Sequence, residues 1–535
     1  MYKYTLATHI IIVLTSSALG ILSPFIIGSF LDNFIEGANV NDIIRFAAIF
    51  GTISLLKILK GYIASILHTK MQLDMGYAFN RDTINHIQSL SLSYINKQDS
   101  AYLSQRASMD TGNLVAFCIS ILQQVITNLV MIIIPFIILL SMNSFVAVLL
   151  LLFFLLYTIL YFVFKKSLYN AGLVFTEAQS KFFSSCLERL RYIKLVKINS
   201  LHNQMNKRTD NSFSLARNAT IHKQKLGYLY SGLDGFVSTI AQIALFIVGG
   251  MQILAGNFTI GMFTVFTSYF NMILNSGRYF FGLGAYYQQT LVAYDRITEI
   301  FTHKPEQHGD KIIDDITKIE LCNVSFTYHG KDNTIESNIV IDNLNATFEK
   351  GKIYGIAGGN GVGKSTLVSL IMGLYINEYS GTIKYSNIDI RHIDMLAARN
   401  NCLAFSEQEP LLFNDTIIYN LTFGEEDEPP LKPSFYKYVD LLSMDEFISG
   451  RTLDFTINEK NTNTSGGEKQ KISILKALYK SPSVMIFDEP TSALDAKTSK
   501  KFISYVKSIK QDKIVIIITH DTTVIDSCDE VLELC

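Results

Sequence analysis

The sequence predicts an all-α six-helix transmembrane domain at residues 1–301, followed by an α/β P-loop NTPase domain at residues 319–535. Composition indicates the membrane domain, because 49% of the 535 residues are hydrophobic and only 17% are charged, against roughly 25% charged residues in soluble domains. A glycine-rich segment at 358–365, between a short apolar strand and a helix, indicates the second domain. The polar segment 302–318 is the expected linker.

Charge and cysteine content argue against other classes of protein. The formal net charge is −1, so no overall positive field favours nucleic acid as a partner. The six cysteines are scattered without C-x-x-C spacing, which predicts neither a zinc site nor a disulfide framework.

The first two expected spans come from the N-terminal segment. Residues 4–31 contain no Asp, Glu, Lys or Arg, which is long enough to cross a bilayer of roughly 30 Å. A cleaved signal peptide is the alternative, but the apolar run continues beyond the possible cleavage site, which favours a retained helix. The second span is expected at about residues 43–67, interrupted by Lys57 and Lys60.

Two longer uncharged segments predict the other four spans as hairpins. Residues 111–164 and 235–277 exceed one bilayer thickness, so we expect turns near residues 141–144 and 255–257. The segment 165–225 carries twelve Lys or Arg against three acids. Since positive residues stay inside, the prediction is a multi-pass protein of the plasma membrane (the inner membrane of a bacterium), with both termini cytoplasmic.

Candidate substrate-cavity residues lie in the second and sixth spans. Lys57 would sit about 20 Å into a span that starts at residue 43, and a charge within the membrane is a functional candidate. Snorkelling to the inner headgroups is the alternative for Lys57. Asn271, Asn275 and Tyr279 belong to an aromatic and amide-rich wall that suits a bulky amphiphile.

The glycine-rich segment fits the phosphate-loop pattern G-x-x-x-x-G-K-[ST]. Backbone N–H groups of such a loop converge on phosphate oxygens at a helix N-terminus. Lys364 is placed to reach the terminal phosphates of a bound nucleotide, and Ser365 to ligate Mg²⁺. The residues expected in the loop are Gly358, Gly359, Asn360, Gly361, Val362, Gly363, Lys364 and Ser365.

Two acids and a histidine follow apolar strands farther along the chain. An acid at the end of an apolar strand in a P-loop protein usually holds Mg²⁺, which suits Asp488 after residues 484–487. Glu489 is then placed to orient or polarise the attacking water. His520, after the apolar residues 514–518, is a candidate partner of the γ-phosphate or the water, with a structural role as the alternative.

Two further features complete the candidate site. Tyr328, at the end of an expected strand, could stack on a nucleotide base or pack in the core. Ser465, Gly466, Gly467 and Glu468 precede a helix, and small residues at a helix N-terminus suit an anion. A second anion site is unusual for a monomeric ATPase and indicates a dimer.

In this order and spacing, the motifs resemble the ATP-binding-cassette family over essentially the whole chain, as in a half-size exporter. The resemblance implies that Tyr328 stacks on adenine, that residues 358–366, Thr366 included, form the Walker A loop, and that Gln408 touches Mg²⁺. It implies that residues 464–468 are the signature motif, which binds the γ-phosphate of the partner's ATP. The remaining roles that it implies are Walker B for Asp488, catalytic carboxylate for Glu489 and switch histidine for His520.

The resemblance also implies partners and a mechanism. ATP and Mg²⁺ would be the cofactors, and ATP bound between two chains would drive alternating access. All site residues are present, so a homodimer suffices, although Thr464 in place of the family's leucine leaves a heterodimer open. Because no peptidase domain precedes the first helix, we expect no cleavage of a leader peptide.

Three functions stay open for the exported or sensed molecule. The first is export of a peptide or peptide-like natural product in a bacterium. The second is export of a lipid or of drugs. The third, from another class, is an ATP-gated membrane protein that transports nothing, which the presence of Glu489 and His520 disfavours.

Overall fold

The computed structural model describes residues 2–37, 39–98, 100–328, 339–423, 434–445, 447–448, 453–458 and 463–534. The chain divides into two compact units. One comprises Met1–Ile84 and Ser104–Thr302, and the other comprises Asn85–Leu103 and His303–Cys535.

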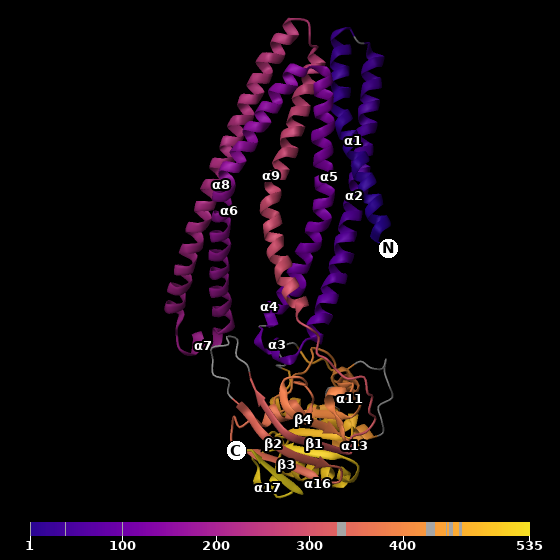
Figure 1. Cartoon of the computed structure of the whole chain (residues 1–535), viewed down its shortest axis with the longest axis vertical. Helices are drawn as coiled ribbons and strands as arrows, with labels where there is room; N and C mark the ends of the chain where they lie inside the picture. Colours follow the sequence, from indigo (N-terminus) through magenta and orange to yellow (C-terminus); the bar gives the residue numbers. More distant parts are fainter. Residues whose placement is uncertain are drawn as a thin grey trace. The chain divides into compact units, whose positions relative to one another are not determined.

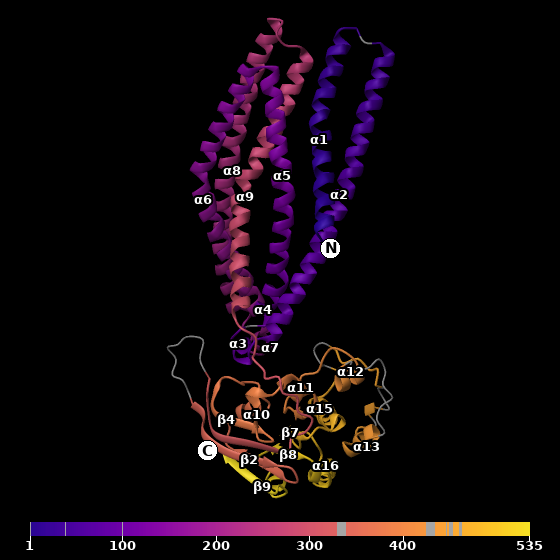
Figure 2. The ribbon, with the colours of Figure 1, turned by 45° about the vertical axis from the view of Figure 1, so that its right-hand side comes forward.

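The described part of the first unit consists of helices joined by short turns (Figure 1). α6 runs beside α8, as Figures 1 and 2 both show, and α9 packs against both α1 and α5. Short helices α4 and α7 and a π-helical turn at Arg106–Asp110 connect the long ones. The bounds are α1 Tyr2–Ile35, α2 Val40–Ser89, α4 Ser100–Gln105, α5 Thr111–Met142, α6 Ser144–Arg191, α7 Ile193–Ile198, α8 His202–Leu254 and α9 Ile260–Thr302.

The expected hairpins are present. α5 ends at Met142 and α6 begins at Ser144, while α8 ends at Leu254 and α9 begins at Ile260, so both turns fall where the sequence predicts them. α2, α6 and α8 also continue far beyond one bilayer thickness, as expected for the polar inner segments.

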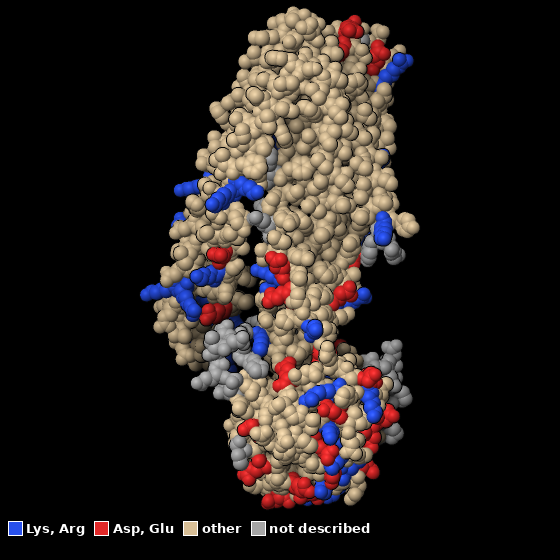
Figure 3. Space-filling view, in the orientation of Figure 1, with Lys and Arg blue, Asp and Glu red and all other residues tan. Residues whose placement is uncertain are grey.

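The count of six spans is confirmed only in part. Four helical segments of the described chain are long and apolar enough to cross a membrane, namely Lys3–Ile35, Tyr102–Met142, Ala147–Arg191 and His202–Leu254. α2 and α9 are helical where spans are expected, but they are not among these four, and both carry charged or amide side chains inside their apolar parts. On the face shown in Figure 3, a band without charged side chains separates the charges near the α1–α2 turn from those toward the other ends of the helices.

A close backbone contact joins α1 to the start of α9. Asp32 Oδ1 accepts a hydrogen bond from the Gly261 backbone N–H at 2.7 Å, and Asp32 Oδ2 accepts one from the Thr259 hydroxyl at 2.6 Å. A Cβ atom on Gly261 would lie only 2.0 Å from the Gly28 carbonyl oxygen. The carboxylate of Asp32 thus satisfies the free N-terminus of α9 while two glycines let the helices approach.

The second unit contains two sheets. The antiparallel sheet has the order β2-β1-β4-β5, and the parallel sheet has the order β6-β7-β8-β3-β9. The strands are β1 Lys318–Thr327, β2 Ile339–Glu349, β3 Ile353–Gly358, β4 Tyr379–Tyr385, β5 Ile388–Asp389, β6 Leu403–Ser406, β7 Val484–Asp488, β8 Ile514–Ile518 and β9 Glu530–Leu534.

Helices cover the parallel sheet on both faces, which explains why its strands are apolar at nearly every position. Along β8, Ile514, Ile516 and Ile518 pack into one core cluster, and the alternate residues Val515 and Ile517 pack into another. The helices of this unit are α3 Leu92–Lys97, α10 Lys364–Ile371, α11 Met395–Asn401, α12 Ile417–Thr422, α13 Ser434–Leu441, α15 Gly466–Lys480, α16 Ala496–Ile509 and α17 Thr522–Ile525, with 3-10 turns at Ile390–His392 and Lys510–Asp512.

The contact between α1 and α9 generates a prediction for stability. We expect Gly261→Ala to destabilise the folded protein by about 1–3 kcal/mol, because the added methyl group overlaps backbone atoms that cannot rotate away. Thermal unfolding of the detergent-solubilised protein measures the change as a lower Tm. The control is Gly250→Ala in α8, where an added Cβ meets no heavy atom within 4 Å. Equal Tm values for the two variants would contradict the packing argument.

Candidate functional site

The candidate site lies along the carboxyl ends of four parallel strands. β3 is followed by the phosphate loop, β7 ends at Asp488, β8 is followed two residues later by His520, and β6 is followed two residues later by Gln408. The order β6-β7-β8-β3 places these ends next to one another, at the edge where α/β sheets bind ligands.

The phosphate loop depends on left-handed backbone conformations. Gly358, Gly361 and Gly363 have φ values of 148°, 84° and 100°, which side chains with a Cβ rarely adopt. A Cβ on Gly358 would also lie 2.5 Å from the carbonyl oxygen of Leu534 on the paired strand β9. These glycines turn the chain sharply into α10, whose first residue is Lys364.

Lys364 folds back over the loop and reaches the other strand ends. Its ammonium donates hydrogen bonds to the carbonyl oxygens of Gly358 at 2.7 Å and Gly359 at 3.1 Å. It also lies 3.0 Å from His520 Nε2, and this nitrogen lies 3.6 Å from Glu489 Oε1. Gln408 Nε2 donates to Glu489 Oε2 at 3.4 Å, so four predicted residues form one polar row.

Glu489 occupies a strained backbone position. Its φ of 45° lies in the left-handed region, which is uncommon for a residue other than glycine. Two hydrogen bonds hold it there: its N–H donates to the Ile518 carbonyl at 2.8 Å, and its own carbonyl accepts from Gln470 Nε2 at 2.7 Å. Strain of this kind gathers at functional sites. The sequence gives no sign that Gln470 would hold this position.

Asp488 and Ser365 offer oxygen atoms for a cation. Burial raises the pKa of the Asp488 carboxyl, and the neighbouring Glu489 charge raises it further, while Lys364 opposes both effects. Within the described part of the chain, neither the carboxylate of Asp488 nor the hydroxyl of Ser365 is used in a hydrogen bond. Hard oxygen donors left free beside a phosphate loop fit Mg²⁺, which takes one or two carboxylates and completes its shell with phosphates. In the described residues no group of three His, Cys, Asp or Glu side chains forms a metal site by itself.

Tyr328 lies beside the loop with its ring accessible. It is 43% exposed, and its hydroxyl is 3.1 Å from Thr366 Oγ1 on α10. Its ring meets those of Phe326 and Tyr375 edge to face, at centroid distances of 4.9 and 6.0 Å. Edge contacts leave ring surface for a base, so stacking on adenine stays a prediction.

The segment predicted as a second anion site caps helix α15. The Ser465 hydroxyl accepts from the Glu468 N–H at 3.2 Å, and a Glu468 carboxylate oxygen accepts from the Ser465 N–H at 2.6 Å, which forms a capping box. This reciprocal pair gives Glu468 a structural role that the sequence reasoning missed. A Cβ on Gly466 would meet no heavy atom within 4 Å, so the helix start is open on that side.

The four predicted substrate-cavity residues are not brought together. Lys57 lines a cavity between α1, α2 and α5, whereas the other three lie on α9. Asn275 Oδ1 accepts from Arg278 Nη1 at 3.0 Å, and Asn271 Oδ1 accepts from Gln242 Nε2 at 3.4 Å. The cavity that Lys57 lines therefore does not include the three candidates on α9.

An ion pair between α8 and α9 is the main feature that sequence reasoning missed in this unit. Arg278 Nη2 lies 2.9 Å from Asp234 Oδ2, and Arg278 Nε donates to the Tyr157 hydroxyl of α6 at 3.2 Å. These two charges flank the uncharged segment 235–277 on either side, which was the available signal. Because Asp234 and Arg278 are far apart in the sequence, their ion pair could not be predicted from it.

Family models match both parts of the chain. The model described as ABC transporter transmembrane region matches residues 6–276, and the model described as ABC transporter matches residues 341–492. The second match contains the phosphate loop, Gln408, the segment 465–468 and Asp488 with Glu489.

Similar proteins align over much of the chain. The Lactococcin-G-processing and transport ATP-binding protein LagD of Lactococcus lactis subsp. lactis is 27% identical over 525 residues, covering 96% of this chain and 72% of that protein. The ATP-dependent lipid A-core flippase of Haemophilus influenzae is 29% identical over 307 residues, covering 56% of this chain and 51% of the flippase. A solved structure of a bacterial Atm1-family ABC exporter with ATP bound has a TM-score of 0.84 at 18% identity, covering 99% of this chain and 94% of that one. The last comparison shows the fold.

The raised pKa of Asp488 generates a prediction with a definite sign. The folded protein disfavours the ionised form of the Asp488 carboxyl. The charge on Asp488 therefore lowers the free energy of unfolding at pH values above the ordinary pKa of 3.8. Without nucleotide and Mg²⁺, we expect Asp488→Asn to raise Tm near pH 7, and the difference to vanish as the pH falls toward 4. Mg²⁺-dependent ATPase activity should fall on the order of a hundredfold or more, because one of the two oxygen donors that fit Mg²⁺ is lost.

The matched control is Asp495, the N-cap of α16. Hydrogen bonds from the Thr498 side chain and backbone lower the pKa of Asp495 to about 2, so its charge adds stability above that range. Asp495→Asn should therefore lower Tm at pH 7 or leave it unchanged. A rise for Asp495→Asn equal to that for Asp488→Asn would show that burial of the charge is not the cause.

Proposed function

The chain belongs to the ABC transporter family, and we propose that it is an ATP-driven exporter of a peptide or peptide-like natural product in the inner membrane of a bacterium. The observation that carries the proposal is the polar row Lys364–His520–Glu489–Gln408, which joins four strand ends. Alignment with a lactococcin transporter over 96% of the chain supports a peptide as the exported molecule.

ATP binding would rearrange this row. The Lys364 ammonium donates hydrogen bonds to the Gly358 and Gly359 carbonyls. Both hydrogen bonds must break before the ammonium can reach the terminal phosphates. His520, freed from Lys364 at the same moment, can turn toward the γ-phosphate while it stays near Glu489. Nucleotide binding would therefore replace the contact between Lys364 and His520 with contacts from each residue to the phosphates. In this way binding would change the position of His520 beside Glu489.

Hydrolysis assigns a separate role to each group. Glu489 accepts a hydrogen bond from the attacking water and so orients it, and its backbone bonds to Ile518 and Gln470 fix the carboxylate in place. Ser365, Asp488 and Gln408 would hold Mg²⁺, which supplies charge to the phosphate oxygens. Gln408 Nε2 donates to Glu489 Oε2, so Gln408 would also help to position the catalytic carboxylate.

Two chains would form the working unit, with both termini in the cytoplasm. The open start of α15 at Gly466 supports a second ATP meeting this helix from a partner chain. A homodimer is sufficient, because each chain supplies a phosphate loop and a segment 465–468.

Lipid export is the second candidate. The alignment with the lipid A-core flippase favours it, although that alignment covers only 56% of this chain and 51% of the flippase. An ATP-gated protein without transport is disfavoured, because hydrogen bonds to two separate elements, β8 and α15, maintain the strained position of Glu489, which would serve hydrolysis rather than nucleotide binding. Reconstitution in liposomes with candidate peptides and lipids, measured as stimulated ATPase and uptake, tests these alternatives.

The role of Glu489 can be tested by separating hydrolysis from binding. We expect Glu489→Gln to lower the ATPase rate on the order of a hundredfold or more, within the range of general-base contributions, because the amide keeps the shape but loses the charge. ATP should stay bound and dimers should accumulate. Lys364→Ala is the comparison, and it should weaken nucleotide binding itself. Hydrolysis by Glu489→Gln at nearly the wild-type rate would refute the catalytic assignment.

A composite site between two chains predicts complementation. Lys364→Ala damages the phosphate loop and Ser465→Arg blocks the start of α15, so each homodimer should be inactive. In a mixture, half of the dimers would contain both variants and one intact composite site, which gives about a quarter of wild-type activity at most. Mixing two differently tagged Lys364→Ala chains is the control. If the mixed variants stay as inactive as the control, the sites are not shared between chains.

A further inference from the structure

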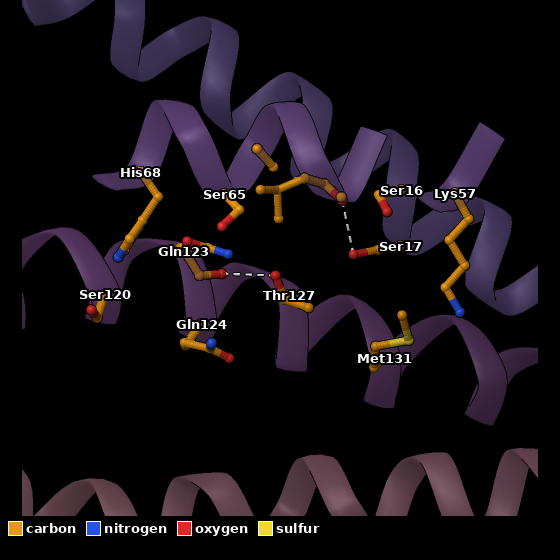
Figure 4. A pocket seen from close by; sticks show the side chains of 13 residues that line it. Ser16, Ser17, Lys57, Ser65, His68, Ser120, Gln123, Gln124, Thr127 and Met131 are labelled. Atoms are coloured by element: carbon orange, nitrogen blue, oxygen red, sulfur yellow. Dashed lines mark hydrogen bonds between the residues drawn. The ribbon is translucent and has the colours of Figure 1, made fainter. Parts of the chain in front are cut away.

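A cavity of about 460 Å³ lies within the helical unit, between α1, α2 and α5 (Figure 4). Its size falls within the usual range for small-molecule sites. Serine hydroxyls from all three helices and the amides of Gln123 and Gln124 line it, together with Val13 and Met131. The wall is therefore mixed, with hydrogen-bonding groups along its whole length.

Lys57 supplies a cation at one end of the cavity. Figure 4 shows its side chain reaching between α1 and α5. A Cβ on Gly20 of α1 would lie 3.9 Å from Lys57 Nζ and 3.3 Å from Met131 Cε of α5. In the described residues this ammonium has no hydrogen bond and no ion pair. The lysine thus reaches from α2 toward α5 at this end of the cavity, and no carboxylate of the described chain neutralises it.

A cluster of imidazole and amide groups forms the opposite end. His68 lines the cavity, and its ring centroid lies 5.8 Å from that of His9, which is only 1% exposed. His9 Nε2 is 3.1 Å from Gln123 Oε1. Nδ1 of His9 and Nδ1 of His68 are both buried without a hydrogen-bond partner in the described structure. Both atoms are shielded from solvent and His9 does not line the cavity, so this end is closed by a packed cluster of imidazole and amide groups, with the His68 side chain at the cavity wall.

The energetics favour a polar, anionic occupant. A lysine inside a membrane span is costly unless it meets an opposite charge. An apolar molecule in this cavity would offer no partner to the Lys57 ammonium, which has none among the described residues. Lys57 and His68 are eleven residues apart on one helix, or roughly 16 Å along its axis. An elongated molecule could bind both ends.

We propose that the cavity between α1, α2 and α5 is a binding site for an elongated amphiphile with one anionic group, a carboxylate or a phosphate, held by Lys57. Its amide or hydroxyl groups extend toward Gln123 and His68. The proposal deepens the export function proposed above and rests on it. Two sources share this chemistry, an exported molecule that ends in a carboxylate and the phosphate of an anionic membrane lipid.

The first experiment measures a carboxylate against its neutral analogue. The full-length protein in phosphatidylcholine nanodiscs is titrated with N-dodecanoylglycine and with N-dodecanoylglycinamide, and partition into empty nanodiscs is subtracted. A charge-assisted hydrogen bond contributes enough to make the carboxylate bind at least about tenfold tighter. Lys57→Met should abolish this preference, and Lys57→Arg should retain it.

Matched variants separate the cavity from general charge effects. Lys60 lies three residues farther along α2 and does not line the cavity, so Lys60→Met should keep the full preference. Ser65→Leu fills the cavity without changing a charge, and it should weaken both ligands. This variant tests the site independently of Lys57.

The second experiment distinguishes the two sources. Native mass spectrometry counts the phosphatidylglycerol molecules retained by the protein after extraction from mixed nanodiscs. Retention by the wild type and Lys60→Met but not by Lys57→Met identifies a lipid phosphate as the occupant, and a carboxylate preference without such retention identifies an exported-type ligand. If neither signal changes in Lys57→Met and Ser65→Leu, the proposal is overturned. The ATPase rate of the wild type, measured in parallel, tests the export function separately.

Discussion

Parallel pairing of β3 with β8 and β9 is the constraint on which the nucleotide site depends. Ile356 is opposite Ile518 on one side, and Gly358 is opposite Leu534 on the other, so the phosphate loop begins at a fixed height along the sheet edge. The same strand β8 pairs Ile518 with Asp488 of β7. The Ile518 carbonyl then accepts from the Glu489 N–H, and together with the Gln470 amide it holds this residue in its left-handed conformation. Backbone register, rather than any side-chain pair, brings the acid, the histidine and the lysine together.

In the helical unit, side-chain contacts between helices neutralise two of the charged groups. Asp234 and Arg278 pair across α8 and α9, and Asp32 binds the N-terminus of α9, so these charges are satisfied within the unit. Removing a charge from water is costly unless a partner with good geometry offsets it. Lys57 departs from this arrangement because its ammonium faces a cavity instead of a carboxylate. This difference from the paired charges is the reason for proposing that Lys57 binds a ligand.

The sequence predicted features whose geometry is set locally, and it missed those set by packing between distant elements. The phosphate loop was predictable because glycine spacing, a strand and a helix lie within twenty residues. Both helical hairpins were predictable because each uncharged segment is too long for one span. The Asp234–Arg278 pair depends on the register of α8 against α9, and the imidazole end of the cavity combines residues from three helices. Glu468 is an intermediate example. Its capping pattern with Ser465 is visible in the sequence, but the segment was interpreted only as an anion site.

A further set of contacts connects the nucleotide site to α3, the segment that follows the long helix α2. In α3, the Asn96 amide donates to the Tyr375 hydroxyl at 3.5 Å, and Ser93 contacts Glu378. The Tyr375 ring meets the edge of Tyr328, whose hydroxyl is 3.1 Å from Thr366 on the phosphate-loop helix. A base that stacks on Tyr328 would therefore contact a ring that is linked to Asn96 of α3 through Tyr375. Tyr328 and Asn96 of α3 are thus joined through a single ring, that of Tyr375.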